Sequence, residues 1–103
     1  MDHPLKRFSR EALTVRLVEA NVPFHLHEGL TEYIVTGRPT GHFLYAVLTN
    51  DLADACNRAD DVNRYRLFDV VYFLTNYAPG GCWRSAANVD AWRAHRGIEG
   101  LPT

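Results

Sequence analysis

The residues best suited to chemistry lie in and just after the stretch GRPTG at 37–41. If a helix begins here, its first backbone N–H groups lack partners within the helix and carry a partial positive charge. Gly41 would let a ligand approach that backbone closely, while Arg38 adds a formal charge and Thr40 a hydroxyl. His42 could donate to the same ligand. The pattern therefore indicates a pocket for a phosphate.

The same stretch also suits a plain turn between two helices. In that interpretation Gly37 ends the first helix, Pro39 stiffens the loop, Thr40 caps the second helix and Gly41 fits a tight turn. Capping explains Thr40 and Gly37 but leaves Arg38 without a role. Both interpretations stay open from the sequence.

A second polar group lies in the sequence RADDVNR. Arg58 and Arg64 could add charge and bind a second phosphate, and Asn63 could hydrogen-bond a base edge or a ribose. The alternative is structural. Arg58 could pair with Asp60 or Asp61, an exposed ion pair worth roughly 0 to 1 kcal/mol, and Asp60 could cap a helix.

One aromatic ring is placed to stack on a base. Tyr45 lies two residues past Phe43, off the face that Phe43 and Val47 share in a helix, so partial exposure is expected. Trp83 and Tyr77 are other candidates, although Trp83 and Trp92 are better explained as core anchors of the last helix. Exposed rings could equally be oligomer contacts.

Metal and catalytic sites have little support. His25 and His27 fall on different faces of a helix and match no zinc spacing. Ser9 and Ser85 lie in no strand–turn–helix elbow, and Cys82 has no evident base. We therefore expect a protein that binds rather than catalyses, with no metal and no cofactor.

Length and composition limit the kinds of protein to which this site can belong. The chain has 103 residues, with 11 Lys and Arg against 12 Asp and Glu, so there is no global attraction to DNA or anionic lipid. One domain over 1–103 is expected. Two cysteines form no disulfide framework, and nowhere do 18 apolar residues run together. The expected location is the cytoplasm of a bacterial host cell, without membrane contact.

Hydrophobic periodicity predicts an all-α fold, a compact bundle of about five short helices with no significant sheet. The N-terminal segment 1–21 contains a helix capped by Ser9, and whether this segment docks on the core is left open. The other predicted helices cover 23–37, 41–59 and 60–78 and a last segment from Ser85 to Gly97. Segment 41–59 is either one kinked helix or a helix–turn–helix corner, because Asn50 and Asp51 interrupt it.

The helix after Asp60 has the strongest pattern. Its apolar residues form a broad surface, which predicts that it is the central helix of the bundle. They are Val62, Tyr65, Phe68, Val71, Tyr72 and Leu74, with Thr75 beside them.

A helix–turn–helix DNA reader is the alternative use of segment 41–59, with 52–59 as recognition helix. Its exposed positions would be Asp51, Asp54, Asn57 and Arg58. Two acids on that surface repel phosphates, so DNA binding is disfavoured.

The run GRPTGHFLYAVLTNDLADACNRADDVNRYRLFDVVYFLTNYAPGGCW resembles a family of small proteins from bacteriophages and mobile elements, some of them labelled transposon-encoded and TnpW-like. The resemblance covers about 22–97, the family-like core, and rests on G-x-P-x-G-x-F-L, N-D-L, R-A-D-x-x-N-R and P-x-x-C-W. Arg84 departs from it, since many members have glycine there. The resemblance implies a small helical fold and a phage or mobile-element origin, and it transfers no catalytic residue.

Such elements need small proteins for DNA transactions or against host defence, and sponge proteins that sequester nucleotide signals are one solution, an analogy of role only. We therefore expect a homo-oligomeric, non-enzymatic protein that binds a small phosphorylated ligand, a nucleotide-derived immune signal. The alternatives are a DNA-binding accessory and a protein–protein inhibitor of a host defence enzyme. The predicted ligand-binding residues are Arg38, Thr40, Gly41, His42, Tyr45, Arg58, Asn63 and Arg64.

Overall fold

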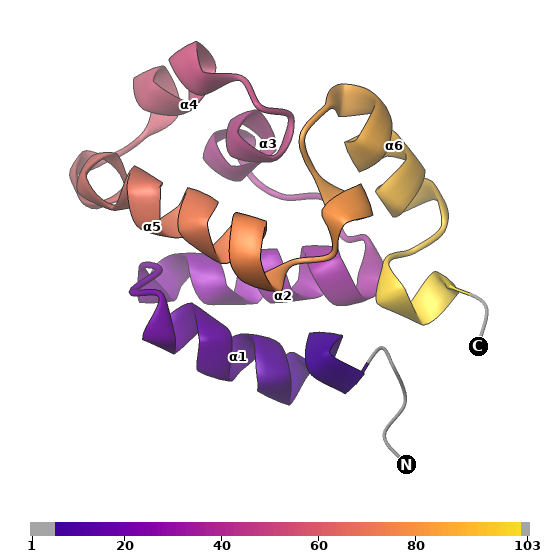
Figure 1. The fold of residues 1–103 in the computed structure, drawn as a ribbon. Helices are drawn as coiled ribbons and strands as arrows, with labels where there is room; N and C mark the ends of the chain where they lie inside the picture. The colour runs from indigo at the N-terminus through magenta and orange to yellow at the C-terminus, as the bar shows by residue number, and fades with distance from the viewer. Residues whose placement is uncertain (1–5, 102–103) are drawn as a thin grey trace.

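The computed structural model describes residues 6–101, and in this range it contains α-helices and short 3-10 helices but no strand. The all-α fold class is confirmed. The α-helices are α1 (Arg10–Glu19), α2 (His27–Thr36), α3 (His42–Leu48), α4 (Leu52–Arg58), α5 (Asp61–Tyr77) and α6 (Ala86–Ala94). The 3-10 helices are η1 (Lys6–Phe8), η2 (Phe24–Leu26), η3 (Gly80–Cys82) and η4 (Ile98–Gly100). Figure 1 shows their arrangement.

Side-chain caps fix where four of the helices begin. Ser9, Asp51, Asp60 and Ser85 each accept a hydrogen bond from the backbone N–H three residues later, at 2.7 to 3.2 Å. Each cap satisfies an amide that has no partner inside the helix. The predicted caps Ser9, Asp60 and Ser85 are therefore confirmed, and so is the helix that follows Ser9.

Segment 41–59 forms two helices rather than one kinked helix. Asn50 takes a φ of 64°, in the left-handed region, which breaks the helical path between α3 and α4. Asp51 then caps α4 and donates its own N–H to the carbonyl of Ala46 at 2.8 Å. The result is a helix–turn–helix corner. It raises the number of α-helices in the described range to six, compared with the five or so that were predicted.

The N-terminal helix docks on the core. Leu13 and Leu17 of α1 are fully buried, and the Arg10 guanidinium forms an ion pair with Glu32 of α2 at 2.9 Å. Residues 1–5 of the predicted segment 1–21 lie outside the described residues. Within 6–101, no helix combines the length and the apolar character needed to cross a bilayer.

The central helix is α2, not α5. Tyr33 and Ile34 of α2 are buried, and the Tyr33 hydroxyl donates to the carbonyl of Cys82 in η3. Trp92 of α6 donates from Nε1 to the carbonyls of Tyr33 and Ile34, each at 3.1 Å. In Figure 1, α1 lies below α2, while α3 and α5 lie above it. Helix α2 therefore joins parts of the chain that are up to 59 residues apart.

The prediction that α5 is a central helix is wrong. It buries only Asn63, Val70, Phe73 and Leu74, and most of the apolar surface predicted for it faces solvent. Helical periodicity identifies which residues share a face, but it does not identify the element that covers that face. Here α2 occupies the middle of the bundle, so α5 packs on one side only.

Candidate anion-binding site

Gly37 holds the predicted phosphate loop against the end of α6. It ends α2 with a φ of 77° and donates its N–H to the carbonyl of Tyr33 at 2.9 Å, as expected of a helix terminator. A Cβ atom on Gly37 would lie 3.0 Å from the Cα of Arg96 and 3.2 Å from the Cα of Arg93. The loop therefore brings Arg38 next to two arginines from the far end of the chain.

Arg38, Arg93 and Arg96, here called the basic corner, are exposed, and within residues 6–101 none of them forms an ion pair. The C-terminal ends of α2 and α6 lie beside them and each contributes about half a negative charge. The Asp90 carboxylate adds one more negative charge. The Glu32 carboxylate, on which the charge of Arg38 also acts, is paired with Arg10. The three guanidinium groups then exceed the charges of Asp90 and the two helix ends by about one, a small positive excess.

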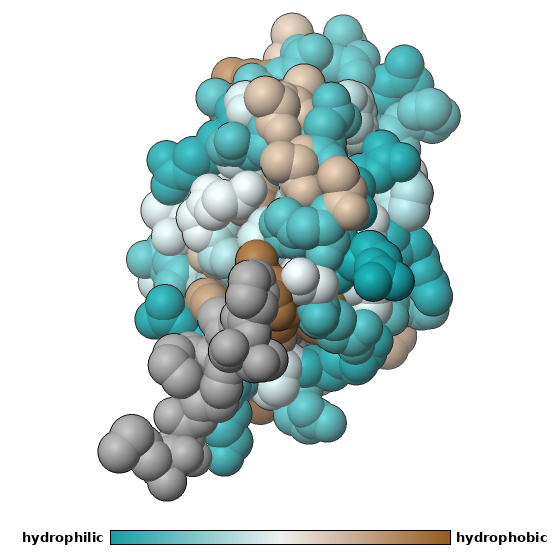
Figure 2. All heavy atoms as spheres, turned by 90° about the vertical axis from the view of Figure 1, so that its right-hand side faces the viewer, coloured by the Kyte–Doolittle hydropathy of each residue, from teal (hydrophilic) through white to brown (hydrophobic). Residues whose placement is uncertain are grey.

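A hollow lies directly against the basic corner. Its volume is about 450 Å³, and it opens broadly to solvent. It is lined by Gly37, Pro39, Asp90, Arg93 and Ala94. Figure 2 shows the side of the molecule that carries the end of α6, where hydrophilic residues predominate. Because it is so open, the hollow is a shallow depression in which a ligand would stay largely exposed, so the charged side chains around it would have to supply most of the binding.

The other residues predicted near Arg38 lie at the start of α3. Gly41 is the N-cap, has no side chain to seal the corner and would have open space around an added Cβ. The alternative in which Thr40 caps this helix is wrong, because the cap position is Gly41. Helix α3 has only seven residues, so most of the charge offered to an anion must come from the arginines. His42 is exposed.

Tyr45 is 40% exposed and lies off the buried face of Phe43 and Val47, which confirms its predicted placement. It follows His42 by three residues on α3, so the two side chains share one helix face. Arg38, Pro39, Gly41, His42 and Tyr45 are thus exposed in this segment, while Phe43 and Leu44 between them are buried.

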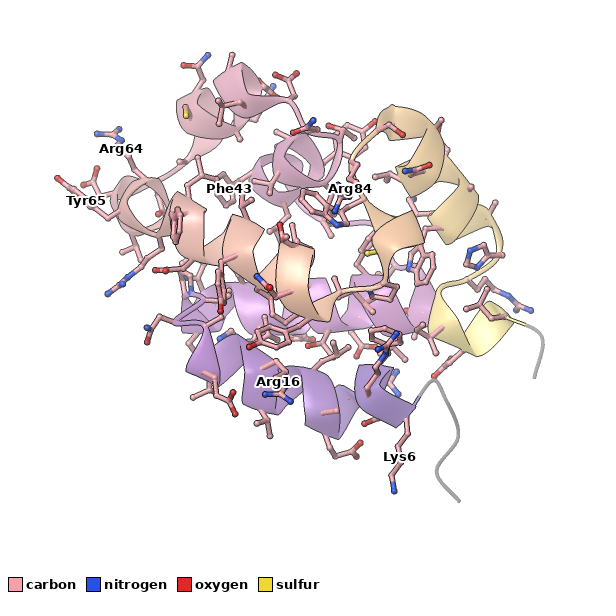
Figure 3. All side chains as sticks on the ribbon, viewed as in Figure 1. Lys6, Arg16, Phe43, Arg64, Tyr65 and Arg84 are labelled. Atoms are coloured by element: carbon pink, nitrogen blue, oxygen red, sulfur yellow. The ribbon has the colours of Figure 1, made fainter. Side chains whose placement is uncertain are left out.

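Arg58, Asn63 and Arg64 lie elsewhere. They belong to the α4–α5 corner, at the opposite end of the molecule from the end of α6 in Figure 1. Figure 3 shows Arg64 pointing away from the protein. The structure does not bring this group to the basic corner, so the eight predicted residues fall into two separate groups.

The local contacts of this second group are structural. Arg58 donates from Nε to both carboxylate oxygens of Asp54, at 3.1 and 3.2 Å, so the predicted pairing with Asp60 or Asp61 is wrong. The i,i+4 spacing on α4 makes Asp54 the nearer partner. Asn63 is 95% buried, since its exposed fraction is 5%, and its backbone N–H binds the Asp60 cap.

Sequence reasoning missed Arg93 and Arg96. Both lie in the stretch WRAHRG at the end of α6, and cations at a helix C-terminus are ordinarily explained by the helix dipole. Arg93 and Arg96 come close to Arg38 only because Gly37 packs against the C-terminal end of α6. The signal in the sequence was the pair of glycines Gly37 and Gly97, each just past a predicted helix.

The ionisable groups of the core are not set up as nucleophiles. Burial raises the pKa of the Cys82 thiol to about 12 and raises the pKa of the Tyr33 phenol above its usual range. The hydrogen bond from Arg10 lowers the pKa of Glu32, and the charge of Arg38 acts in the same direction.

Within the described range, no group of three or more His, Cys, Asp or Glu side chains could hold a metal ion.

Comparison with protein-family models, with curated proteins and with solved structures gives no match. The resemblance to the mobile-element family therefore stays a prediction.

Proposed function

We propose that this protein is a non-enzymatic protein of phage or mobile-element origin that binds and sequesters a small phosphorylated ligand, a nucleotide-derived immune signal of the host. The observation that carries the proposal is the exposed Arg38, free of ion pairs within 6–101, which directly follows Gly37 at the hollow of about 450 Å³ that Gly37 and Arg93 line. A planar guanidinium binds phosphate through two parallel hydrogen bonds.

The neighbouring groups supply the rest of the recognition. The open backbone at Gly41 and the hydroxyl of Thr40 can donate to phosphate oxygens, and His42 stands next to them. Tyr45 offers a ring face for a base. Because the protein needs no reaction to act, sequestration follows from mass action: free signal falls when affinity exceeds that of the host effector.

Duplex DNA is a less suitable ligand. The helix that would enter the major groove is α4, where Arg58 is held by Asp54 and Asp51 adds a second acid. The formal net charge of −1 gives no sequence-independent attraction to the DNA backbone. A small ligand requires only the local charge of the basic corner.

Native mass spectrometry tests the proposal directly. Protein is purified from phage-infected and uninfected bacteria as wild type, as Arg38→Ala and as the matched control Arg58→Ala. Wild type and Arg58→Ala are expected to retain a small phosphorylated compound that Arg38→Ala loses. Ligand-free protein in all samples, or equal retention by the Arg38→Ala variant, would contradict the proposal. A mobility shift of labelled duplex with steep salt dependence would favour the DNA-binding alternative.

A further inference from the structure

Helix α5 carries an aromatic face that nothing in the described part of the chain covers. Tyr65 is 83% exposed, Phe68 78% and Tyr72 45%, with Val62 and Val71 exposed on either side. We call these five residues the α5 face. Spacings of three and four residues place the rings on one stripe of the helix. In Figure 3, Tyr65 points away from the protein into open space.

The size of this apolar surface lies at the upper end of what a monomer ordinarily exposes. Taking about 200 Å² for a whole aromatic side chain, the three rings expose roughly 400 Å². Val62, Val71 and the neighbouring Leu52, which is 67% exposed, bring the patch to roughly 600 Å². Monomers rarely expose more than a few hundred Å² in one patch, and a stable dimer buries about 800 Å² on each partner. The patch therefore amounts to roughly three-quarters of the area that each partner of a standard dimer buries.

A small apolar hollow continues the α5 face toward α4. Leu52, Val71 and Trp83 are among the residues that line it, and its volume is about 100 Å³. The Nε1 atom of Trp83 is buried and has no hydrogen-bond partner within residues 6–101. A buried donor without an acceptor is destabilising, so the core beneath this hollow carries a local cost.

The charges around the α5 face differ between its two ends. Asp60 and Asp61 stand at the N-terminal end of α5. Near the other end, the Arg16 guanidinium lies 4.9 Å from the ring centroid of Tyr77, while it also pairs with Glu19 at 3.0 Å. Arg84 likewise lies 4.8 Å from the ring centroid of Trp83, beside the hollow that Val71 lines. Arg64 stands close to these acids, Arg66 and Asp69 of α5 pair with each other at 3.1 Å, and Asp51 lines the same hollow as Trp83, so the N-terminal end keeps a small excess of negative charge. Antiparallel pairing of two copies keeps the two acidic ends apart, whereas parallel pairing would set them together.

We propose that the α5 face is a two-fold interface with a second copy of this chain, in which the two α5 helices pack antiparallel. Phe68 lies near the middle of the 17-residue helix and close to the axis, and Tyr65 faces Tyr72 of the second copy. A two-fold interface uses the same patch on both subunits, so it must be self-complementary in shape and charge. Antiparallel packing keeps the acidic N-terminal ends of the two α5 helices apart. This interface does not depend on the proposed ligand.

Analytical ultracentrifugation of the full chain tests whether the interface forms. Wild type is expected to sediment at twice the chain mass of 11.7 kDa at micromolar concentrations, and Phe68→Glu is expected to weaken the dimer at least tenfold. Phe24→Glu is the matched control, because Phe24 is 86% exposed but lies in η2, outside the α5 face. The control should stay dimeric. Circular dichroism of both variants verifies that they fold.

Two outcomes would overturn the proposal. One is a wild-type protein that stays monomeric at all concentrations, which would leave the α5 face for a foreign protein. The other is a dimer that Phe24→Glu disrupts and Phe68→Glu does not.

Disulfide crosslinking tests the direction of the helices. In a Cys56→Ser background, which removes the exposed thiol, Tyr65→Cys and Tyr72→Cys variants are mixed and oxidised. Antiparallel packing predicts at least a fivefold excess of the mixed 65–72 disulfide over either homodimer. Preferential 65–65 and 72–72 disulfides would show parallel packing and contradict the proposed interface.

Discussion

The backbone of Gly37 packs against the chain just after α6, so that a Cβ atom on Gly37 would lie 3.0 Å from the Cα of Arg96. The contact joins the C-terminal end of α2 to the C-terminal end of α6. Because Arg38 follows Gly37 directly, the same contact assembles the basic corner from Arg38, Arg93 and Arg96. The proposed anion site thus depends on a backbone contact as much as on the three charges.

Replacing Gly37 should destabilise the fold. The Gly37→Ala variant places a Cβ on a residue with a φ of 77° and against backbone atoms that cannot easily move. We expect the free energy of unfolding, measured by urea denaturation, to fall by roughly 1 to 3 kcal/mol. Gly80→Ala is the control, because an added Cβ there meets nothing within 4 Å and its φ is not positive. Equal losses in the two variants would argue against the contact.

Position 84 has a backbone conformation that favours glycine, so glycine should be more stable there than alanine. The φ of Arg84 is 94°, and its N–H donates to the carbonyl of Leu48 at 2.7 Å, which holds this backbone conformation in place. Arg84→Gly and Arg84→Ala both lose the guanidinium over Trp83 and differ only in the Cβ atom. We expect the glycine variant to be more stable than the alanine variant by about 1 kcal/mol in thermal and urea unfolding. An alanine variant of equal or higher stability would show that position 84 is not strained.

The Arg10–Glu32 pair should make stability depend on pH at the acidic end. Arg10 donates to Glu32 from Nε at 2.9 Å and from Nη2 at 3.1 Å, which lowers the pKa of Glu32. A lowered folded-state pKa contributes stability that is fully present above the unfolded value of about 4.3 and is lost as pH falls through the folded value. Glu32→Gln should therefore flatten the loss of unfolding free energy below about pH 5. Glu28→Gln, on the same helix but in no ion pair within 6–101, should leave the wild-type slope unchanged.

The two thiols should react at very different rates. Cys56 is exposed on α4, whereas Cys82 is buried and its pKa is raised to about 12. At pH 8, a disulfide reagent such as Ellman's reagent should label one thiol per folded chain quickly and the second only after unfolding, because thiolate is the reactive form. Cys56→Ser should remove the fast phase. Two fast thiols in folded wild type would contradict the burial of Cys82.

Much of the local structure could be predicted from the sequence because short-range chemistry determines it. Ser9, Asp60 and Ser85 cap helices through bonds to amides three residues away, and Gly37 ends α2 by its left-handed backbone. Such signals need no knowledge of distant parts of the chain. The role of α5 did need that knowledge. Tyr65 and Phe68 have the character of core residues, but α2 takes the central place through its bonds to Cys82 and Trp92.

The residues of the candidate site likewise fall into those that the sequence predicts from local spacing and those that only the packing brings together. Arg38, Gly41 and Tyr45 were predicted because they lie close together in one segment. Arg93 and Arg96 are more than 50 residues away, and only the packing of Gly37 brings them in. The prediction for Arg58 was wrong for a local reason. Its partner is Asp54, one helical turn earlier on α4, and not Asp60 or Asp61, which lie beyond the end of α4.

The most direct test of the proposed anion site is a titration of isotope-labelled protein with inorganic pyrophosphate, followed by the backbone amide signals in nuclear magnetic resonance. If the basic corner binds anions, saturable shifts are expected at residues 37–42 and 93–97. These shifts should be lost in an Arg38→Ala/Arg93→Ala double variant and kept in an Arg58→Ala/Arg64→Ala double variant. Shifts confined to 58–64, or no saturable shift at all, would contradict the proposed anion site.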